Sequence, residues 1–221
     1  FVNMFIGHGG EFFKAGTAEP NINNAKGVAT LNMLKKLASL SNPDYLTHDS
    51  EAIKVEWESG KVALMTLWAS RSGTLLDDEG DAKITAATKL TGPATVGGGN
   101  IPAATLWWDG FTLAKNRSDS DAEASFIALA HAASNKKMVA DAADQAVWLV
   151  EGFVPGPKSI GVIEAVKMGA KPYPMLPQMG LMHGALGSEI VEFLQGKESA
   201  EQALKDVEAA YISKAKEQGF L

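Results

Sequence analysis

The sequence predicts an α/β fold. Residues 61–68 form a nearly continuous apolar run of strand length, a pattern typical of a strand buried inside a sheet. Apolar residues recur every three positions across residues 28–37, and two alanine-rich segments follow later in the chain; both patterns indicate helices. Because the chain has 221 residues, of which 46% are hydrophobic and 21% charged, it can bury a sizeable core.

The N-terminal third contains two expected helices. After a turn-rich opening, Asn23 or Asn24 can cap the first of them. The second is short; it begins at Ser50 and stops at Gly60. One apolar stripe along the first helix consists of Val28, Leu31, Leu34 and Leu37. We expect that stripe to pack against another element.

The apolar run at 61–68 is expected to end at a ligand-binding edge. In a parallel α/β sheet, crevices form outside the carboxyl ends of the strands. Trp68 ends the expected strand and Arg71 lies just beyond it, so both residues are placed at such an edge. A second strand-like run spans residues 105–114, and Asp109-Gly110 interrupts it at a point where the chain can change direction.

The C-terminal half is expected to be mainly helical. Two alanine-rich helices are predicted over residues 121–133 and 136–147, the second capped by Asn135. The last helix begins with the capping box Ser199-x-x-Gln202, and one side of it carries Ala203, Val207, Ala210 and Tyr211. We find no internal repeat and no low-complexity linker.

Composition excludes several classes of function. Lys, Asp, Asn or Gly interrupts every apolar run, so no segment reaches the roughly 20 consecutive apolar residues that a membrane-spanning helix needs. The net charge of −6, without any cluster of Lys and Arg, offers nothing to neutralise a phosphate backbone, and nucleic acid is not expected as a partner. Cysteine is absent, which rules out disulfides and thiolate nucleophiles and fits an oxidising compartment.

Templates for catalysis and metal binding are missing from the sequence. It contains no G-x-S-x-G, no H-E-x-x-H and no G-x-x-x-x-G-K-[ST] motif. The four histidines are scattered, so neither a metal site nor a cofactor is expected. The acidic cluster Asp77, Asp78, Glu79 and Asp81 lacks the ligand spacing of a calcium loop and is expected to be a solvated surface turn.

Tryptophans stand at the positions where a cleft is expected. Sugars present flat C–H faces ringed by hydroxyl groups, so a sugar site needs an aromatic plate and polar groups around it. Trp68 or Trp108 could supply the plate. Asp109, Arg71 and His183 could supply the polar rim. The alternative is that the tryptophans fill the core, which is the more common role of large aromatic residues.

Several short motifs follow one another in a specific order and spacing. The earlier ones are Gly9-Gly10-x-Phe12-Phe13, Asn24-x-x-Gly27-Val28 and the Gly-Lys-Val-Ala-Leu-Met of residues 60–65, followed by Trp68. The later ones are a strand at 110–114 before an acidic, alanine-rich helix, the Tyr-Pro-Met-Leu-Pro of residues 173–177, and Gly196-Lys197 followed by Ser-Ala-Glu-Gln-Ala-Leu at 199–204. Together they resemble the family 1 extracellular solute-binding proteins, and the resemblance runs through most of the chain.

The resemblance implies an α/β fold of the periplasmic-binding-protein type (type II). In such proteins two lobes are joined by crossover strands, and the ligand lies in a cleft that closes by a hinge motion. Residues 1–106 would be the first part of the C-terminal lobe and residues 159–221 its second part. Residues 107–158 would be a hinge crossing with a returning segment of the N-terminal lobe. Hinge crossings are implied near residues 106–110 and 155–161.

The resemblance also implies that the family's first lobe is missing from this chain. The sequence begins at Phe1 without an initiator Met or the pattern of a signal peptide. We therefore expect a longer parent chain that was cleaved, split or truncated. Two alanine-rich helices without the sheet that they normally cover would expose apolar surface.

The function implied by the resemblance is binding for transport, not catalysis. The chain would belong to a monomeric receptor, periplasmic or anchored outside the membrane, that delivers a carbohydrate or polyol to the permease subunits of an ABC importer. Trp68 matches a position that stacks on sugar in maltose-binding protein, a member of the family. His183 stands where that member has another stacking tryptophan. Since imidazole offers a hydrogen bond but less stacking area, a smaller sugar or a polyol is implied.

Other interpretations remain open. Trp107 and Trp108 have no strict counterpart in the family, so their place in a site rests on the hinge argument alone. A carbohydrate-active enzyme would need a pair of carboxylates in the cleft, and Asp109 with Glu151 is the pair that the sequence offers. A helical interaction module would instead use the alanine-rich helices as its partner surface.

Overall fold

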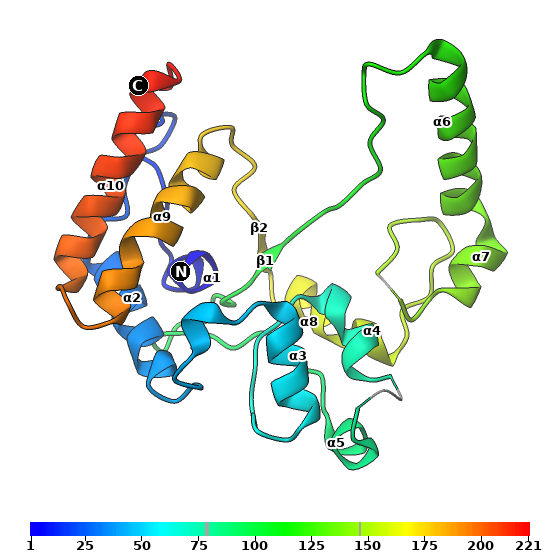
Figure 1. Ribbon diagram of the computed structural model, residues 1–221, viewed down its shortest axis with the longest axis horizontal. Helices are drawn as coiled ribbons and strands as arrows, with labels where there is room; N and C mark the ends of the chain where they lie inside the picture. Colours follow the sequence, from blue (N-terminus) through cyan, green and yellow to red (C-terminus); the bar gives the residue numbers. More distant parts are fainter. Residues whose placement is uncertain (78–79, 146) are drawn as a thin grey trace. The chain divides into compact units, whose positions relative to one another are not determined.

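The computed structural model describes residues 1–77, 80–145 and 147–221. Helices dominate these residues, and one two-stranded sheet accompanies them (Figure 1). The chain divides into two compact units. Unit 1 comprises Phe1–His48, Pro93–Leu106 and Lys167–Leu221, and unit 2 comprises Asp49–Gly92 and Trp107–Val166.

Unit 1 is built around a helical core. Its elements are α1 (Val2–Gly7), α2 (Ala25–Ala38), the 3-10 helix η1 (Tyr45–Thr47), β1 (Thr105–Leu106), β2 (Lys171–Pro172), α9 (Met179–Leu194) and α10 (Ala200–Glu217). Helices α9 and α10 pack side by side, and α2 packs against both (Figure 1). The predicted apolar side of α10 lies in the core: Ala203, Val207 and Tyr211 are fully buried, and Ala210 is partly buried. Leu31 of α2 is buried with them.

Side-chain caps fix where two of these helices begin. The Asn24 side chain accepts hydrogen bonds from the backbone amides of Lys26 and Gly27 at 2.9 and 3.2 Å, so Asn24 is the N-cap of α2. Ser199 caps α10 in the same way, since its hydroxyl accepts a bond of 3.1 Å from the amide of Gln202. Both predicted helix starts are therefore confirmed.

The sheet of unit 1 is a short parallel pair. Thr105 lies opposite Lys171 and Leu106 opposite Pro172. The amide of Tyr173 then donates to the carbonyl oxygen of Leu106 at 3.0 Å, which extends the pairing by one bond. The strand predicted over residues 105–114 is thus confined to its first two residues. This pair fixes the chain just before α9.

The apolar run at 61–68 is not a strand, so the prediction of a buried strand there is wrong. Leu64, in the middle of the run, is 90% exposed. A strand needs a partner that receives its backbone hydrogen bonds. The regular strand pairing within the described residues joins 105–106 to 171–172, and it leaves this run without a partner strand.

Unit 2 contains the remaining helices. They are α3 (Ser50–Glu58), η2 (Ala69–Arg71), α4 (Ser72–Leu75), α5 (Ala82–Ala87), α6 (Asp119–Ser134), α7 (Lys136–Asp141), η3 (Pro157–Ser159) and α8 (Ile160–Lys167), whose last residue falls in unit 1. Helix α3 contacts α4 and α5, and α6 contacts α7. The predicted start of α3 is confirmed, and Gly60 follows this helix with a φ of 70°, a conformation that favours glycine.

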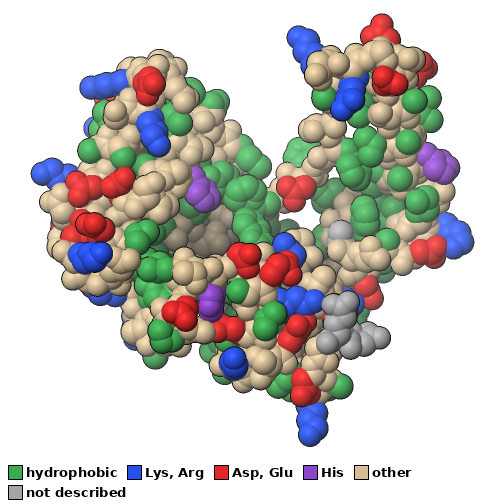
Figure 2. All heavy atoms as spheres, viewed as in Figure 1, with side chains coloured by type: hydrophobic (Ala, Val, Ile, Leu, Met, Phe, Trp, Pro, Cys, Tyr) green, Lys and Arg blue, Asp and Glu red, His purple; other side chains and the backbone are tan. Residues whose placement is uncertain are grey.

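The two alanine-rich helices are present, with different lengths. Helix α6 matches its prediction, whereas α7 ends at Asp141 instead of residue 147. Asn135 caps α7 as predicted, by accepting bonds from the amides of Lys137 and Met138. No residue of α6 is buried, and Phe126 is 64% exposed. Hydrophobic side chains are visible along α6 in Figure 2.

The boundaries of the two units can be compared with the lobe boundaries that the resemblance implies. The boundary between Leu106 and Trp107 is common to both divisions. Residues 49–92, implied to belong to the C-terminal lobe, cluster instead with residues 107–166 in unit 2. The assignment of segments to lobes of a parent protein stays a prediction.

Candidate functional site

The indoles of Trp68 and Trp107 meet on the surface of unit 2. Their ring centroids lie 5.3 Å apart and their planes are inclined by 75°, an edge-to-face contact. Trp68 is 54% exposed and Trp107 is 42% exposed, so neither ring fills the core. Trp108 and Phe111, which follow Trp107 in the chain, are still more exposed. Unit 2 therefore presents exposed aromatic side chains from two segments of the chain.

Local structure explains how Trp68 comes to the surface. The residue is the N-cap of η2, at the end of the apolar run 61–68, and its carbonyl oxygen accepts a 2.9 Å hydrogen bond from the amide of Arg71. Helix α4 follows η2 without a break. This bond closes a turn, so Trp68 lies where the run 61–68, which has no regular structure, ends and η2 begins.

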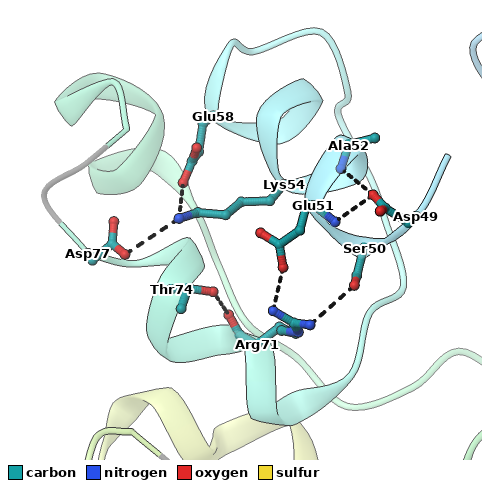
Figure 3. A network of polar contacts seen from close by, with 9 residues as sticks. All are labelled: Asp49, Ser50, Glu51, Ala52, Lys54, Glu58, Arg71, Thr74 and Asp77. Carbon is teal, nitrogen blue, oxygen red and sulfur yellow. Dashed lines mark hydrogen bonds and ion pairs between the residues drawn. The ribbon is translucent and has the colours of Figure 1, made fainter.

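Arg71 ties this turn to α3. Its Nη1 donates to Glu51 Oε1 at 2.6 Å, and its Nη2 donates to the Ser50 hydroxyl at 3.3 Å (Figure 3). The Arg71 carbonyl oxygen accepts a bond of 2.9 Å from the Thr74 hydroxyl. Two of the guanidinium nitrogens are thus engaged with the first turn of α3. Arg71 holds the turn that carries Trp68, and its side chain is still 42% exposed.

A second ion cluster secures the other end of α4. The ammonium of Lys54 lies 3.4 Å from Glu58 Oε1 and 3.8 Å from Asp77 Oδ2 (Figure 3). All three side chains are mostly buried, with exposures of 16%, 18% and 28%. Helix α3 therefore anchors both ends of the segment that contains η2 and α4.

The acidic cluster at 77–81 has separate roles for the members that can be placed. Asp77 pairs with Lys54, and Asp81 caps α5 by accepting a bond of 2.8 Å from the amide of Lys83. Asp78 and Glu79 lie outside the described residues. Within the described ranges, no group of three or more His, Asp or Glu side chains could hold a metal ion.

The remaining acidic candidates lie in unit 2. Asp109 directly follows Trp108 and is exposed, and Glu151 is exposed as well. Trp57, which belongs to α3, offers a contrast with Trp68. It is half-buried, and its Nε1 donates to the Thr88 hydroxyl at 3.0 Å.

His183 belongs to unit 1 and has a partner that sequence reasoning did not single out. It is an exposed residue of α9, and its Nδ1 lies 2.8 Å from the hydroxyl oxygen of Tyr173. Tyr173 follows β2 and is buried, and this burial raises the pKa of its phenol. The tyrosine opens the Tyr-Pro-Met-Leu-Pro motif, so its place just before α9 was the signal that could have drawn attention to it.

The fold resembles that of known sugar-binding proteins. Maltose-bound MalE3 of T. maritima superposes with a TM-score of 0.75 at 16% identity, and 95% of this chain is covered. The maltose/maltodextrin-binding domain MalE of Bdellovibrio bacteriovorus, bound to maltotriose, gives a TM-score of 0.77 at 16% identity, with 97% of this chain covered. This chain shares their fold. No family model matches the sequence, and neither does a curated protein.

The similarity covers only part of those maltose-binding structures. This chain spans 55% of the T. maritima protein and 57% of the Bdellovibrio protein. About half of a MalE-like fold is therefore present here, helix-rich and with a small sheet. In the described part of the chain, no helix is long and apolar enough to cross a membrane.

Proposed function

We propose that this chain is part of a carbohydrate- or polyol-binding receptor of an ABC importer, and that it binds its ligand without changing it. The observation that carries the proposal is the exposed pair Trp68 and Trp107 on a chain with the fold of sugar-binding proteins. Large aromatic side chains are costly to leave in water, and exposed clusters of them mark binding surfaces.

The chemistry of the pair suits a sugar. The C–H face of a pyranose can stack on the open face of one indole, while the second indole, inclined by 75°, borders the ligand at its edge. Trp108 and Asp109, the exposed residues that follow Trp107 in the chain, offer an indole N–H and a carboxylate, which can bond ring hydroxyls. Arg71 contributes mainly by holding the Trp68 turn against α3, since Glu51 and Ser50 engage its guanidinium.

We further propose that a longer receptor supplies the rest of the binding cleft. The similar sugar-binding proteins are nearly twice as long as this chain, and α6 exposes Phe126 and Ile127 on a helix without buried residues. A first lobe would cover that face, close over the ligand by a hinge motion, and complete an extracytoplasmic receptor that docks on permease subunits. Sugar affinity of this chain alone is then weak.

A thermal-shift screen of sugars and polyols, including maltose and maltotriose, tests the proposal. A ligand that binds only the folded state raises the melting temperature, and the rise grows with the ratio of its concentration to its Kd. At least one member of the panel should raise the melting temperature of the wild-type chain at millimolar concentration, and the Trp68→Ala variant should lose that rise. A panel without any effect, or a sugar that is consumed on incubation, contradicts a binding protein for sugars.

A further inference from the structure

The pair Tyr173 and His183 is held from both sides by rigid structure. Tyr173 is buried, and its amide is bonded to Leu106 at the end of the β1–β2 pair. His183 lies in the second turn of α9, directly after the fully buried Met182. The two rings lie 5.9 Å apart at an angle of 43°, and their polar atoms are 2.8 Å apart. Neither side chain therefore needs to reorganise to keep this bond.

Chemistry decides the direction of the bond. A neutral imidazole has one nitrogen that donates and one that accepts, and a phenol can do either. The imidazole nitrogen is a stronger base than a phenol oxygen, and the phenol is a stronger acid than an imidazole N–H. The favourable arrangement is donation from the Tyr173 hydroxyl to Nδ1 of His183. The ring proton then resides on Nε2.

We propose that Tyr173 is a positioning residue that locks His183 in the Nε2–H tautomer, so that Nε2 of this exposed residue of unit 1 can donate one hydrogen bond to an acceptor oxygen of a sugar or polyol. The arrangement is the one by which a second group commonly fixes the tautomer and orientation of a functional histidine. For a sugar or polyol, the acceptor is a hydroxyl or ring oxygen. The hydrogen bond to a ligand rests on the proposed sugar-binding function. The tautomer of His183 rests only on its contact with Tyr173.

A fixed tautomer would let His183 select among ligands by hydrogen bonding. A donor fixed in place discriminates between ligands with and without an acceptor at one position. A ligand without the acceptor leaves the N–H of the histidine unpaired, which costs binding free energy. A stacking side chain would accept any flat apolar face.

Nuclear magnetic resonance of the ring nitrogens tests the tautomer without any ligand. The chain is labelled with ¹⁵N in its histidine rings and studied well above the usual imidazole pKa. His183→Gln identifies the signals of His183 by their loss. We expect a pyridine-type shift for Nδ1 and a pyrrole-type shift for Nε2 in the wild type. Tyr173→Phe should move the Nδ1 signal towards that of a nitrogen that accepts no hydrogen bond, while His8, His48 and His131 keep their signals.

Two spectral results overturn the proposal. One is a protonated Nδ1 of His183 in the wild type. The other is an Nδ1 signal that Tyr173→Phe leaves in place.

A titration with maltose tests whether His183 donates a hydrogen bond to a ligand. His183→Phe should weaken maltose binding roughly tenfold, and His183→Gln, which keeps an N–H donor, should weaken it less. Equal maltose affinity of wild type and His183→Phe contradicts the donor role. If the wild type binds no maltose, the proposal that maltose is a ligand is contradicted. The nitrogen spectra still test the tautomer, because they are recorded without any ligand.

Discussion

Trp68 and Trp107 form an edge-to-face pair at 5.3 Å although they come from separate segments of unit 2. Both rings remain substantially exposed. An aromatic pair of this geometry contributes about 0.5 to 1.5 kcal/mol beyond the area that it buries. The pair is thus partly a structural contact and partly an open surface. Its contribution to stability and its contribution to ligand binding can be measured separately.

Trp57→Ala should lower the stability of the chain more than Trp68→Ala does. Because Trp68 is more than half exposed, its removal should cost little beyond its contact with Trp107, about 0.5 to 1.5 kcal/mol. Trp57 is half-buried and bonded to Thr88, so its removal should cost about 2 kcal/mol or more. Urea unfolding curves of both variants measure this. A Trp68→Ala variant that unfolds would return this residue to the core-filling role.

The contact between the two indoles should appear as a coupling energy. We expect Trp68→Ala and Trp107→Ala to be non-additive in unfolding free energy by about 0.5 to 1.5 kcal/mol, the value typical of such pairs. A double-mutant cycle by chemical denaturation gives the number. Trp68→Ala combined with Tyr211→Phe, a substitution in the core of unit 1, is the control, and it should be additive. Additivity of the first cycle would mean that the rings do not interact in solution.

The ion cluster around Lys54 should matter more than a similar pair at the surface. Lys54→Met removes the ammonium that lies between Glu58 and Asp77, which leaves two carboxylates in a mostly buried place, at an expected cost of about 2 kcal/mol. Lys137 also pairs four residues along its helix, with Asp141, but both side chains are exposed. Lys137→Met should therefore cost less than about 0.5 kcal/mol. Equal costs in thermal or urea unfolding would show that burial does not strengthen the Lys54 cluster.

Two glycines of unit 1 should respond to alanine with opposite signs. A Cβ at Gly27 would lie 2.1 Å from the carbonyl oxygen of Ile22, so Gly27→Ala should destabilise the chain by about 2 kcal/mol or more. At Gly187, inside α9, a Cβ would meet nothing within 4 Å. Gly187→Ala should stabilise by up to about 1 kcal/mol, because alanine favours the helix. The shift in denaturation midpoint relative to wild type gives the sign directly, and a stabilised Gly27→Ala would contradict the described approach of α2 to Ile22.

Helix starts could be predicted from the sequence because their signals are local. Asn24, Asn135 and Ser199 cap the helices that follow them, and each needs only backbone amides two or three residues away. The buried stripe of α10 was predictable for the same reason, since spacing along one helix sets which side is apolar.

Strands could not be predicted in this way. The run at 61–68 has the composition of a buried strand, yet pairing depends on a distant partner that its own residues do not specify. The candidate site shows the same limit. That Trp68 meets Trp107, or that Tyr173 meets His183, depends on how separate segments fold. The sequence nominated Trp68, Trp107 and His183 as individual residues, and it did not single out Tyr173.

The central claim is that the exposed face of Trp68 binds sugar, and saturation-transfer-difference spectroscopy tests it most directly because it detects weak, rapidly exchanging ligands. Wild type, Trp68→Ala and the control Trp57→Phe are each mixed with maltose and with the sugars and polyols that raise the melting temperature. The account predicts transfer to the C–H protons of one ring face in wild type and Trp57→Phe, and its loss in Trp68→Ala. Transfer of equal strength in Trp68→Ala, or no transfer from wild type to any sugar or polyol, would contradict it.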